Sequence, residues 1–306
     1  MKILITGGAG YIGFSLIQAI FQSHNQVDEI IIYDNLSRKN YSLFMNNKFN
    51  GKGIKFIHGD ILDGRTLKKV LDNVEVVIHL AAKVSTPFAD NEAHFFDQVN
   101  NWGTAQLVSC VEGISSVRHF VYLSSASVYG NSMEQIDENS LPFPGSFYGI
   151  SKLKGEKQVQ RLAQKMKVHL VRSGNVYGYN PAMRIDSVIN KFMFDANFIG
   201  KINIHGNGEQ IRPFIRVDKL AFILKEILYK EITSGVFNIF ERNISINEIV
   251  ETVKELYPEL DIISINPDMN MRKIQLKPAS KLLSYCTLPS KDFLDELREF
   301  KTSFSF

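Results

Sequence analysis

Short, largely β-branched apolar runs alternate with longer amphipathic stretches from the start of the chain to about residue 178. The apolar runs predict strands over 2–6, 29–34, 54–58, 74–80, 119–124 and 168–173. The amphipathic stretches predict helices near 12–23, 66–72, 92–113 and 147–166. Runs that are apolar throughout, such as residues 30–33, suit a sheet that is covered on both faces. The alternation therefore predicts an α/β fold with a doubly wound parallel sheet.

Beyond about residue 178 the segments become shorter and more irregular, with a turn cluster at 206–208. Helices are predicted there near 184–197, 218–230 and 246–256. We therefore expect two units. Residues 1–178 form a Rossmann-type domain to which some later segments return, and residues 179–306 form a smaller, mostly helical cap over the carboxyl edge of the sheet.

The composition excludes several other classes of protein. Of the 306 residues, 44% are apolar and 22% are charged, which is ordinary for a globular chain. The two cysteines, Cys110 and Cys286, form no CxxC pair, and the histidines show no HxH or HExxH spacing, so we expect neither a disulfide scaffold nor a metal site. The net charge of +3 comes from mixed signs, which argues against nucleic-acid binding. Without a spanning apolar run or a signal peptide, we expect a cytoplasmic protein that does not bind membranes.

A glycine-rich loop, GGAGYIG at residues 7–13, follows the first predicted strand and opens the first predicted helix. Glycines in this position permit a tight turn and let the backbone approach a pyrophosphate at the helix N-terminus. Asp34 ends the second predicted strand, where a carboxylate accepts the ribose hydroxyls of a dinucleotide. These features predict a dinucleotide cofactor in residues 1–178. Asp34 would repel a 2′-phosphate and favours NAD over NADP, whereas Arg38 and Lys39 could hold that phosphate.

Tyr148 and Lys152 lie four residues apart and therefore on one face of a predicted helix. A cation beside a phenol favours the phenolate, which can exchange a proton with an alcohol while hydride moves to or from nicotinamide. The fifth predicted strand ends in serines, and Ser125 is placed to contact the same substrate oxygen.

These motifs together resemble an extended short-chain dehydrogenase/reductase of the NAD-dependent nucleotide-sugar epimerase/dehydratase family, like the UDP-glucose 4-epimerases. The resemblance spans nearly the whole chain. It is carried by residues 6–13 (TGGAGYIG), 34–37 (DNLS), 59–60 (GD), 79–82 (HLAA), 100–104 (NNWGT), 125–130 (SASVYG), 148–152 (YGISK) and 175–178 (NVYG).

The resemblance implies roles for individual residues. The implied cofactor-binding residues are Gly7, Gly10, Tyr11, Ile12, Gly13, Asp34, Asn35, Ser37, Asp60, Ile61, Leu80, Ala81, Ala82, Lys83, Asn100, Tyr148 and Lys152. The implied catalytic residues are Ser125, Tyr148 and Lys152. Ser125, Asn175, Arg212 and Arg272 are implied to bind a nucleotide-diphosphate sugar, with the two arginines on the diphosphate. The family also pairs the helices near 92–113 and 147–166 between two subunits, which implies a homodimer.

The residues that follow Ser125 bear on the reaction. Relatives that eliminate water carry Asp-Glu at these positions, and this chain has Ala126 and Ser127. The resemblance therefore favours a 4-epimerase that inverts C4 through a transient 4-keto sugar, with a UDP-hexose as the expected substrate. Pro213 stands where the family usually has aspartate, and Arg216 where it has histidine or tyrosine, so the nucleotide base and the sugar stay open.

Three alternatives stay open. Residues 34–39 (DNLSRK) are similar to those of CDP-paratose 2-epimerases, which oxidise C2 by the same logic. A nucleotide-sugar dehydratase or reductase of the same family is the second alternative. A non-catalytic NAD-binding sensor is the third, and the presence of Ser125, Tyr148 and Lys152 argues against it.

Overall fold

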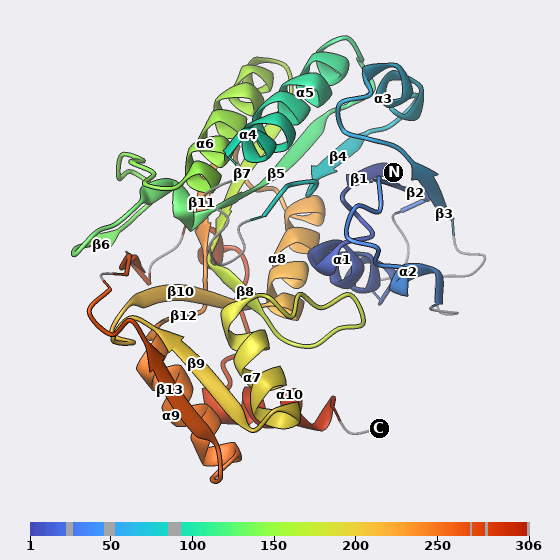
Figure 1. Cartoon of the computed structure of the whole chain (residues 1–306). Helices are drawn as coiled ribbons and strands as arrows, with labels where there is room; N and C mark the ends of the chain where they lie inside the picture. Colours follow the sequence, from blue (N-terminus) through green and yellow to red (C-terminus); the bar gives the residue numbers. More distant parts are fainter. Residues whose placement is uncertain (23–26, 46–52, 85–92, 270, 279–280, 305–306) are drawn as a thin grey trace.

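The computed structural model describes residues 1–22, 27–45, 53–84, 93–269, 271–278 and 281–304 (Figure 1). A seven-stranded parallel sheet lies at the centre of this part of the chain, in the order β11-β7-β5-β4-β1-β2-β3. The order reverses between β1 and β4, and ligands of such sheets bind at the carboxyl ends of the strands near this point. Its strands are β1 (Lys2–Thr6), β2 (Glu29–Asp34), β3 (Ile54–His58), β4 (Val76–His79), β5 (His119–Ser125), β7 (Lys167–Ser173) and β11 (Gly235–Ile239).

Helices cover both faces of this sheet, which confirms the predicted doubly wound α/β fold (Figure 1). One face packs against α3 (Gly64–Val70), α5 (Thr104–Glu112) and α6 (Phe147–Gln160), and the other against α1 (Tyr11–Gln22) and α8 (Val217–Tyr229). Successive side chains of a strand point to opposite faces. Ile3 and Ile5 accordingly lie in the core beside α1 and α8, while Leu4 lies in the core on the other face.

The helix predicted near 92–113 is divided into three parts. α4 (Ala93–Phe96) passes into a π-helical segment, η3 (Asp97–Gly103), which continues as α5. The wider turn of a π-helix changes which residues share a face, and such segments are frequent at functional sites. Residue 92 of this predicted helix and residue 23 of the first predicted helix lie outside the described residues.

The helix predicted near 147–166 ends earlier, because α6 gives way to a 3₁₀ turn, η5 (Arg161–Gln164).

The cap contains more strand than the mostly helical cap predicted. Its helices α7 (Val188–Phe198), α9 (Ile246–Leu256) and α10 (Phe293–Thr302) accompany two small sheets. One sheet has the order β12-β10-β8, and the other pairs β13 with β9. The bounds of these strands are β8 (Asn175–Tyr177), β9 (Lys201–His205), β10 (Ile211–Arg216), β12 (Arg242–Ser245) and β13 (Asp261–Ile265).

Two segments beyond residue 178 return to the central sheet. α8 packs beside α1, and β11 pairs with β7 at the edge of the sheet. Strand β11 was not predicted, because its run GVFNI begins with glycine and includes the polar residue Asn238. The boundary at residue 178 stays a prediction.

The remaining short elements are α2 (Ser42–Met45), β6 (Gln135–Ile136), β14 (Gln275–Leu276), and the 3₁₀ turns η4 (Ala126–Tyr129) and η6 (Lys281–Ser284). Among the described residues, no helix has the length and apolar character needed to cross a membrane.

Candidate active site

The glycine loop joins β1 to α1 in the strand–loop–helix arrangement that its sequence predicts. Gly7 has a φ of 71°, and a Cβ atom there would lie 2.5 Å from the backbone nitrogen of Ala81. A Cβ atom on Gly13 would lie 2.5 Å from the carbonyl oxygen of Gly8. The missing side chains therefore keep a cradle open at the N-terminus of α1, where backbone N–H groups attract anions. This geometry fits the pyrophosphate of a dinucleotide.

Asp34 links the end of β2 to the glycine loop. Its carboxylate accepts hydrogen bonds from the backbone N–H groups of Ala9, at 3.1 Å, and Leu36, at 2.8 Å. Burial raises the pKa of this carboxyl group, while the two backbone hydrogen bonds lower it. The carboxylate therefore shapes the loop as well as lying where the sequence predicts a ribose contact.

Four of the predicted cofactor-binding residues follow β2 and β3. Asp60 accepts a hydrogen bond from the side chain of Asn35, at 2.9 Å, and Ser37 donates its backbone N–H to Asn35. Ile61 is buried against Gly103. The structure thus gathers Asn35, Ser37, Asp60 and Ile61 at the carboxyl ends of β2 and β3, as predicted.

Asn100 ties the loop after β4 to the helix that carries Tyr148. Its side-chain oxygen accepts the backbone N–H of Lys83, at 2.9 Å, and its side-chain nitrogen donates to the Lys83 carbonyl, at 2.8 Å. The same nitrogen donates to the hydroxyl of Ser151, at 2.9 Å. Asn100 lies inside the π-helical segment and is buried, so the irregular turn places it at this junction. Leu80, Ala81 and Ala82 occupy the loop that it fixes.

The structure brings together the three residues of a candidate catalytic triplet, Ser125, Tyr148 and Lys152. Ser125 ends β5, and its hydroxyl hydrogen-bonds with the phenol of Tyr148 from α6. Ser146 caps α6 by accepting a hydrogen bond from the backbone N–H of Gly149, at 3.1 Å, which fixes the turn that presents Tyr148. Burial raises the pKa of the Tyr148 phenol, whereas Arg184 and Ser125 lower it.

Lys152 is almost fully buried one helical turn after Tyr148, with 2% of its surface exposed. Its Nζ atom lies 4.2 Å from the centre of the Tyr122 ring. Burial lowers the pKa of Lys152 from 10.5 to about 7, and the negative charge of Glu156 opposes this shift. The ammonium is therefore held at the edge of deprotonation near neutral pH.

Three further residues shape the site, and the sequence analysis did not predict them. Arg184 lies near enough to Tyr148 and Tyr11 to lower the pKa of both phenols, and it pairs with Asp186 at 2.8 Å. Glu156 lies one turn beyond Lys152. The spacing of four residues between Lys152 and Glu156 was a signal that could have identified Glu156, but no spacing rule pointed to Arg184 or Asp186.

The side chain of Tyr11 points toward the cap. The phenol donates to the carbonyl of Gly178, at 2.5 Å, and accepts from Asn190 at 3.4 Å. Tyr11 thereby joins the start of α1 to the cap. Its backbone N–H, like that of Ile12, stays at the N-terminus of α1, where a ligand could be bound.

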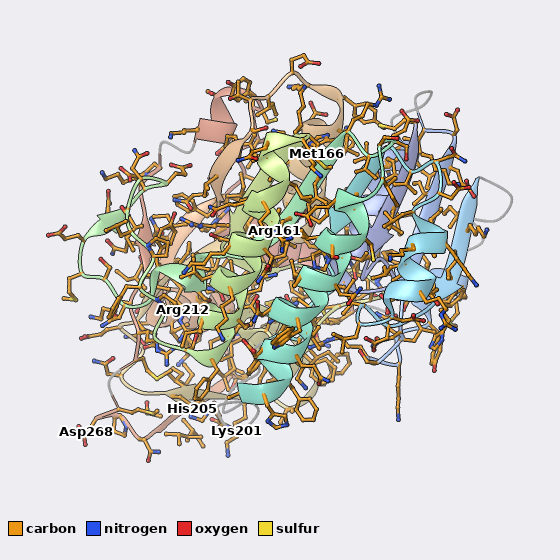
Figure 2. All side chains as sticks on the ribbon, turned by 90° about the horizontal axis from the view of Figure 1, so that it is seen from above. Arg161, Met166, Lys201, His205, Arg212 and Asp268 are labelled. Carbon is orange, nitrogen blue, oxygen red and sulfur yellow. The ribbon has the colours of Figure 1, made fainter. Side chains whose placement is uncertain are left out.

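The predicted substrate residues lie on the cap side. Arg212 is on the central strand of the small sheet β12-β10-β8, and it is labelled together with His205 and Lys201 on the cap in Figure 2. Burial and the positive charge of Arg272 both lower the pKa of Arg212. The fold therefore brings the two guanidinium groups near each other. Within the described part of the chain, neither arginine forms an ion pair.

Arg272 is positioned by the strand that follows it. β14 pairs with β6, and the Lys273 backbone N–H donates to the side chain of Asn131 at 2.8 Å. This arrangement places the Arg272 side chain beside Gly145, just before α6. Asn175 begins β8 and donates to the carbonyl of Pro213 at 3.2 Å.

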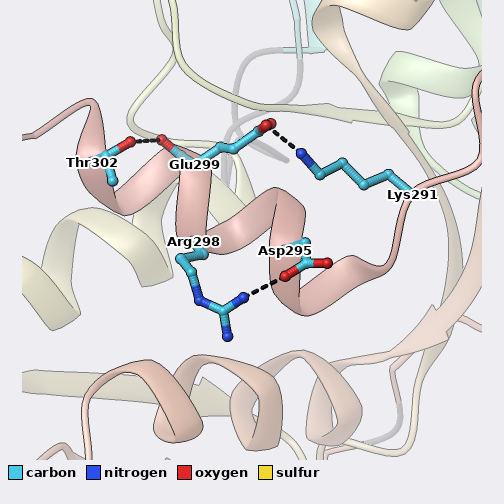
Figure 3. Close-up of a pocket in the computed structure, with 5 residues that line it drawn as sticks. All are labelled: Lys291, Asp295, Arg298, Glu299 and Thr302. Carbon is cyan, nitrogen blue, oxygen red and sulfur yellow. Dashed lines mark hydrogen bonds and ion pairs between the residues drawn. The ribbon is translucent and has the colours of Figure 1, made fainter.

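A surface depression on the cap contains none of these residues. It is lined by Lys291, Asp295, Arg298, Glu299 and Thr302, on α10 and just before it (Figure 3). Its charges pair with each other, Lys291 with Glu299 and Arg298 with Asp295, so it offers no unmatched charge to a ligand.

Comparisons with known proteins show the family of the chain. The family model described as the NAD dependent epimerase/dehydratase family matches residues 3–239. The mouse (Mus musculus) dTDP-D-glucose 4,6-dehydratase is 31% identical over 290 residues, which cover 89% of this chain and 80% of that protein.

Solved structures of two 4-epimerases superimpose on almost the whole chain. One is a variant of the UDP-glucuronic acid 4-epimerase from Bacillus cereus, in complex with a UDP-4-deoxy-4-fluoro-glucuronic acid and NAD. It is 25% identical, with a TM-score of 0.88 over 99% of this chain and 98% of that one. The other is the UDP-N-acetylglucosamine 4-epimerase from Methanobrevibacter ruminantium, 25% identical, with a TM-score of 0.86 over 99% and 97% of the two chains. The chain therefore belongs to the NAD-dependent epimerase/dehydratase family, as its motifs predict, and NAD is its cofactor.

Proposed function

We propose that the protein is an epimerase of a nucleotide-diphosphate sugar that inverts C4 through a transient 4-keto intermediate. The observation that carries this proposal is the composition of the catalytic edge of the sheet. Ser125, Tyr148 and Lys152 meet there, while the two positions after Ser125 hold Ala126 and Ser127. Neither of these two side chains can supply the acid/base pair that an elimination of water requires.

The cofactor is proposed to lie along the carboxyl edge of the sheet. The glycine loop and the N-terminus of α1 would hold its pyrophosphate, and Asp34 its adenosine ribose. Asp60 and Ile61 would border the adenine, the loop 80–83 the middle of the cofactor, and Lys152 the nicotinamide ribose. Bound there, NAD would supply the hydride acceptor for C4 of the sugar and the hydride donor for its return.

Tyr148 is the proposed base. As phenolate it takes the proton of the C4 hydroxyl when hydride leaves C4, and it gives the proton back when hydride returns. The positive charge of Arg184 lowers the pKa of the phenol, and Ser125 hydrogen-bonds to the same phenol. Lys152 lies one helical turn after Tyr148, where it would hold the nicotinamide ribose. Atoms and electrons balance over one cycle, because the hydride and the proton both return to the sugar.

An elimination would need a further acid at the reacting carbons. Ala126 is buried, and the hydroxyl of Ser127 accepts a hydrogen bond from Ser125 at 3.1 Å. The nearest carboxylate along α6, that of Glu156, is buried in an ion pair with Arg172 at 2.7 Å. This arrangement supports the epimerase over a dehydratase.

Arg212 and Arg272 are the proposed grip on the diphosphate of the substrate. Two guanidinium groups that lie close together without carboxylate partners in the described residues suit an anion with several oxygens. Anchoring through the diphosphate would leave the 4-keto sugar free to turn. Asn175 is the proposed third contact, and a UDP-hexose is the proposed substrate.

A nucleotide-sugar 4,6-dehydratase is the second candidate. The specific observation in its favour is the 31% identity to the mouse dTDP-D-glucose 4,6-dehydratase over most of both chains. A cytoplasmic homodimer, with η3, α5 and α6 at the subunit contact, is proposed for the assembled protein.

A panel of UDP-, CDP-, dTDP- and GDP-sugars, followed by NMR in D₂O, tests the proposal. With a sugar deuterated at C4, an epimerase yields the C4 epimer, keeps the label at C4 and takes up no solvent deuterium. A dehydratase yields a 4-keto-6-deoxy sugar that carries solvent deuterium, and a 2-epimerase inverts C2. If no sugar is converted while NAD stays bound, the protein is a binding protein and the proposal is wrong.

A further inference from the structure

A buried ion pair lies directly behind the catalytic face of α6. The carboxylate of Glu156 accepts hydrogen bonds from Arg172 on β7, from Nε at 2.9 Å and from a terminal nitrogen at 2.7 Å. Glu156 is 1% exposed and Arg172 is 4% exposed. A two-pronged contact between buried groups is strong and has a fixed geometry, so it constrains the position of α6 relative to β7.

The pair is connected to both halves of the catalytic triplet. Glu156 lies one helical turn beyond Lys152, on the same face of α6. Its carboxylate also accepts a hydrogen bond from the hydroxyl of Ser124 at 2.5 Å, and Ser124 directly precedes Ser125 on β5. One carboxylate therefore contacts the strand that presents Ser125 and lies on the helix that presents Tyr148 and Lys152.

The guanidinium of Arg172 is fixed from its other side. Its remaining terminal nitrogen donates to the phenol of Tyr129 at 2.9 Å, and that phenol donates to the side chain of Asn238 at 2.8 Å. Arg172 also lies over the ring of Tyr129, with 4.8 Å between the guanidinium carbon and the ring centre. These contacts reach β11, the edge strand of the sheet, so Arg172 does not move freely with Glu156.

Glu156 is the carboxylate that faces Lys152. The other groups around Lys152 are Tyr148 on α6, Tyr122 on β5 and His79 on β4. His79 is held between Thr6 and Thr104, and burial lowers its pKa to about 3, so it is neutral at neutral pH. Burial also raises the pKa of the Tyr122 phenol, which keeps it neutral. Arg172 on β7 is a further charged group and lies behind Glu156.

We propose that the Glu156–Arg172 pair positions the active site, by holding the catalytic face of α6 against the end of β5 while the Glu156 carboxylate places a negative charge one helical turn from Lys152. The role assigned to Lys152 rests on the proposed function. Glu156 and Arg172 are both buried in the interior, so their proposed action is through Lys152 and Ser125. Because the pair is neutral overall, it can hold α6 against β5 without leaving an uncompensated charge in the interior.

NMR of the NAD-bound protein labelled with ¹³C at lysine Cε gives the protonation midpoint of Lys152, identified by the signal that Lys152→Met removes. Glu156→Gln is expected to lower this midpoint by about one unit or more, because a nearby negative charge is lost and Arg172 is left unpaired. The double variant Glu156→Gln/Arg172→Met removes both charges, and its midpoint is expected to return toward the wild-type value. A merely structural role predicts no such recovery.

Glu296→Gln is the matched control, because Glu296 is also a buried carboxylate, paired with Lys219 and Arg242 in the cap. It is expected to lower the melting temperature and leave the Lys152 midpoint unchanged. The protonation midpoint of Lys152 is measured without turnover, so this test can be done whether or not a sugar substrate is found.

If Glu156→Gln alone does not fold, Arg172→Met is compared with the double variant, since these two differ only in the Glu156 carboxylate. The midpoint is then expected to be about one unit higher where the carboxylate is present. An unchanged midpoint in Glu156→Gln, or equal midpoints in this second comparison, would overturn the proposal.

Discussion

The Nζ atom of Lys152 lies 4.2 Å from the centre of the Tyr122 ring, at a position where only 2% of the lysine is exposed. The electron-rich ring face offers a cation a favourable contact, but it does not replace the lost hydration. Lys152 is therefore held in place at a cost in stability, which is common for groups that serve a reaction.

Lys152→Met is expected to stabilise the cofactor-free protein. The folded protein gives up the Lys152 proton near pH 7, whereas the unfolded chain keeps it to about 10.5. Folding stability of the wild type therefore rises as the pH increases from about 7 to 10.5, and the cost is fully present below 7. At pH 7 the variant should be more stable by about 1–3 kcal/mol and should lose activity. Urea unfolding of wild type and variant at pH 7 and pH 9 measures the free energy of unfolding at each pH. A lower free energy of unfolding for the variant at pH 7 would contradict this account.

Tyr148→Phe is expected to reduce kcat by about a hundred- to ten-thousand-fold, which is the usual contribution of a positioned proton-transfer group. The ring and its packing against Phe96 are retained, so NAD binding should stay close to that of the wild type. Tyr179→Phe, on a half-exposed tyrosine outside the site, is the control. Turnover and NAD binding are measured together, and retained turnover would show that Tyr148 is not the base.

Arg212→Met is expected to raise the KM for the nucleotide sugar by about 10- to 100-fold, because one charge-assisted contact to the diphosphate is lost. NAD affinity and the position of the catalytic residues should be unaffected. Arg298→Met is the matched control, because Arg298 lies on α10 and pairs with Asp295. Steady-state kinetics with the substrate found in the panel provides the measurement, and an unchanged KM would place the diphosphate elsewhere.

We expect the free energy of unfolding to fall in acid because of the buried residues His119 and His169. Their rings hydrogen-bond at 2.8 Å, and burial lowers their pKa values to about 3 and about 4. The unfolded chain binds these protons near pH 6.5, so stability is lost as the pH falls below 6.5, by up to about 1.4 kcal/mol per pH unit for each histidine. His119→Gln should reduce this slope between pH 6 and pH 4 in urea unfolding, and His94→Gln, on an exposed histidine, should not. Equal slopes in wild type and His119→Gln would rule the pair out as the cause.

The main strands and helices of the first 178 residues could be predicted from the sequence, most of them to within two residues at each end. β1, β2 and β3 begin and end at the residues predicted for them, because each is rich in isoleucine and is bounded by polar or turn residues. The π-helical segment around Asn100 and the edge strand β11 could not be predicted. The first depends on which contacts the side chain of Asn100 makes, and the second on pairing with β7, and neither is a local property of the chain.

The sequence by itself determined the fold class and the glycine loop with Asp34. It also singled out Ser125, Tyr148 and Lys152 as candidate catalytic residues, because spacing along a strand or helix fixes which residues share an edge or a face. Only the tertiary structure decided their surroundings. It buried Lys152 beside Glu156, brought Arg184 to Tyr148, joined Tyr11 to the cap, and set Arg272 near Arg212. The physical reason is that burial and the charges of residues distant in sequence set the proton affinity of a group, and both exist only once the chain has folded.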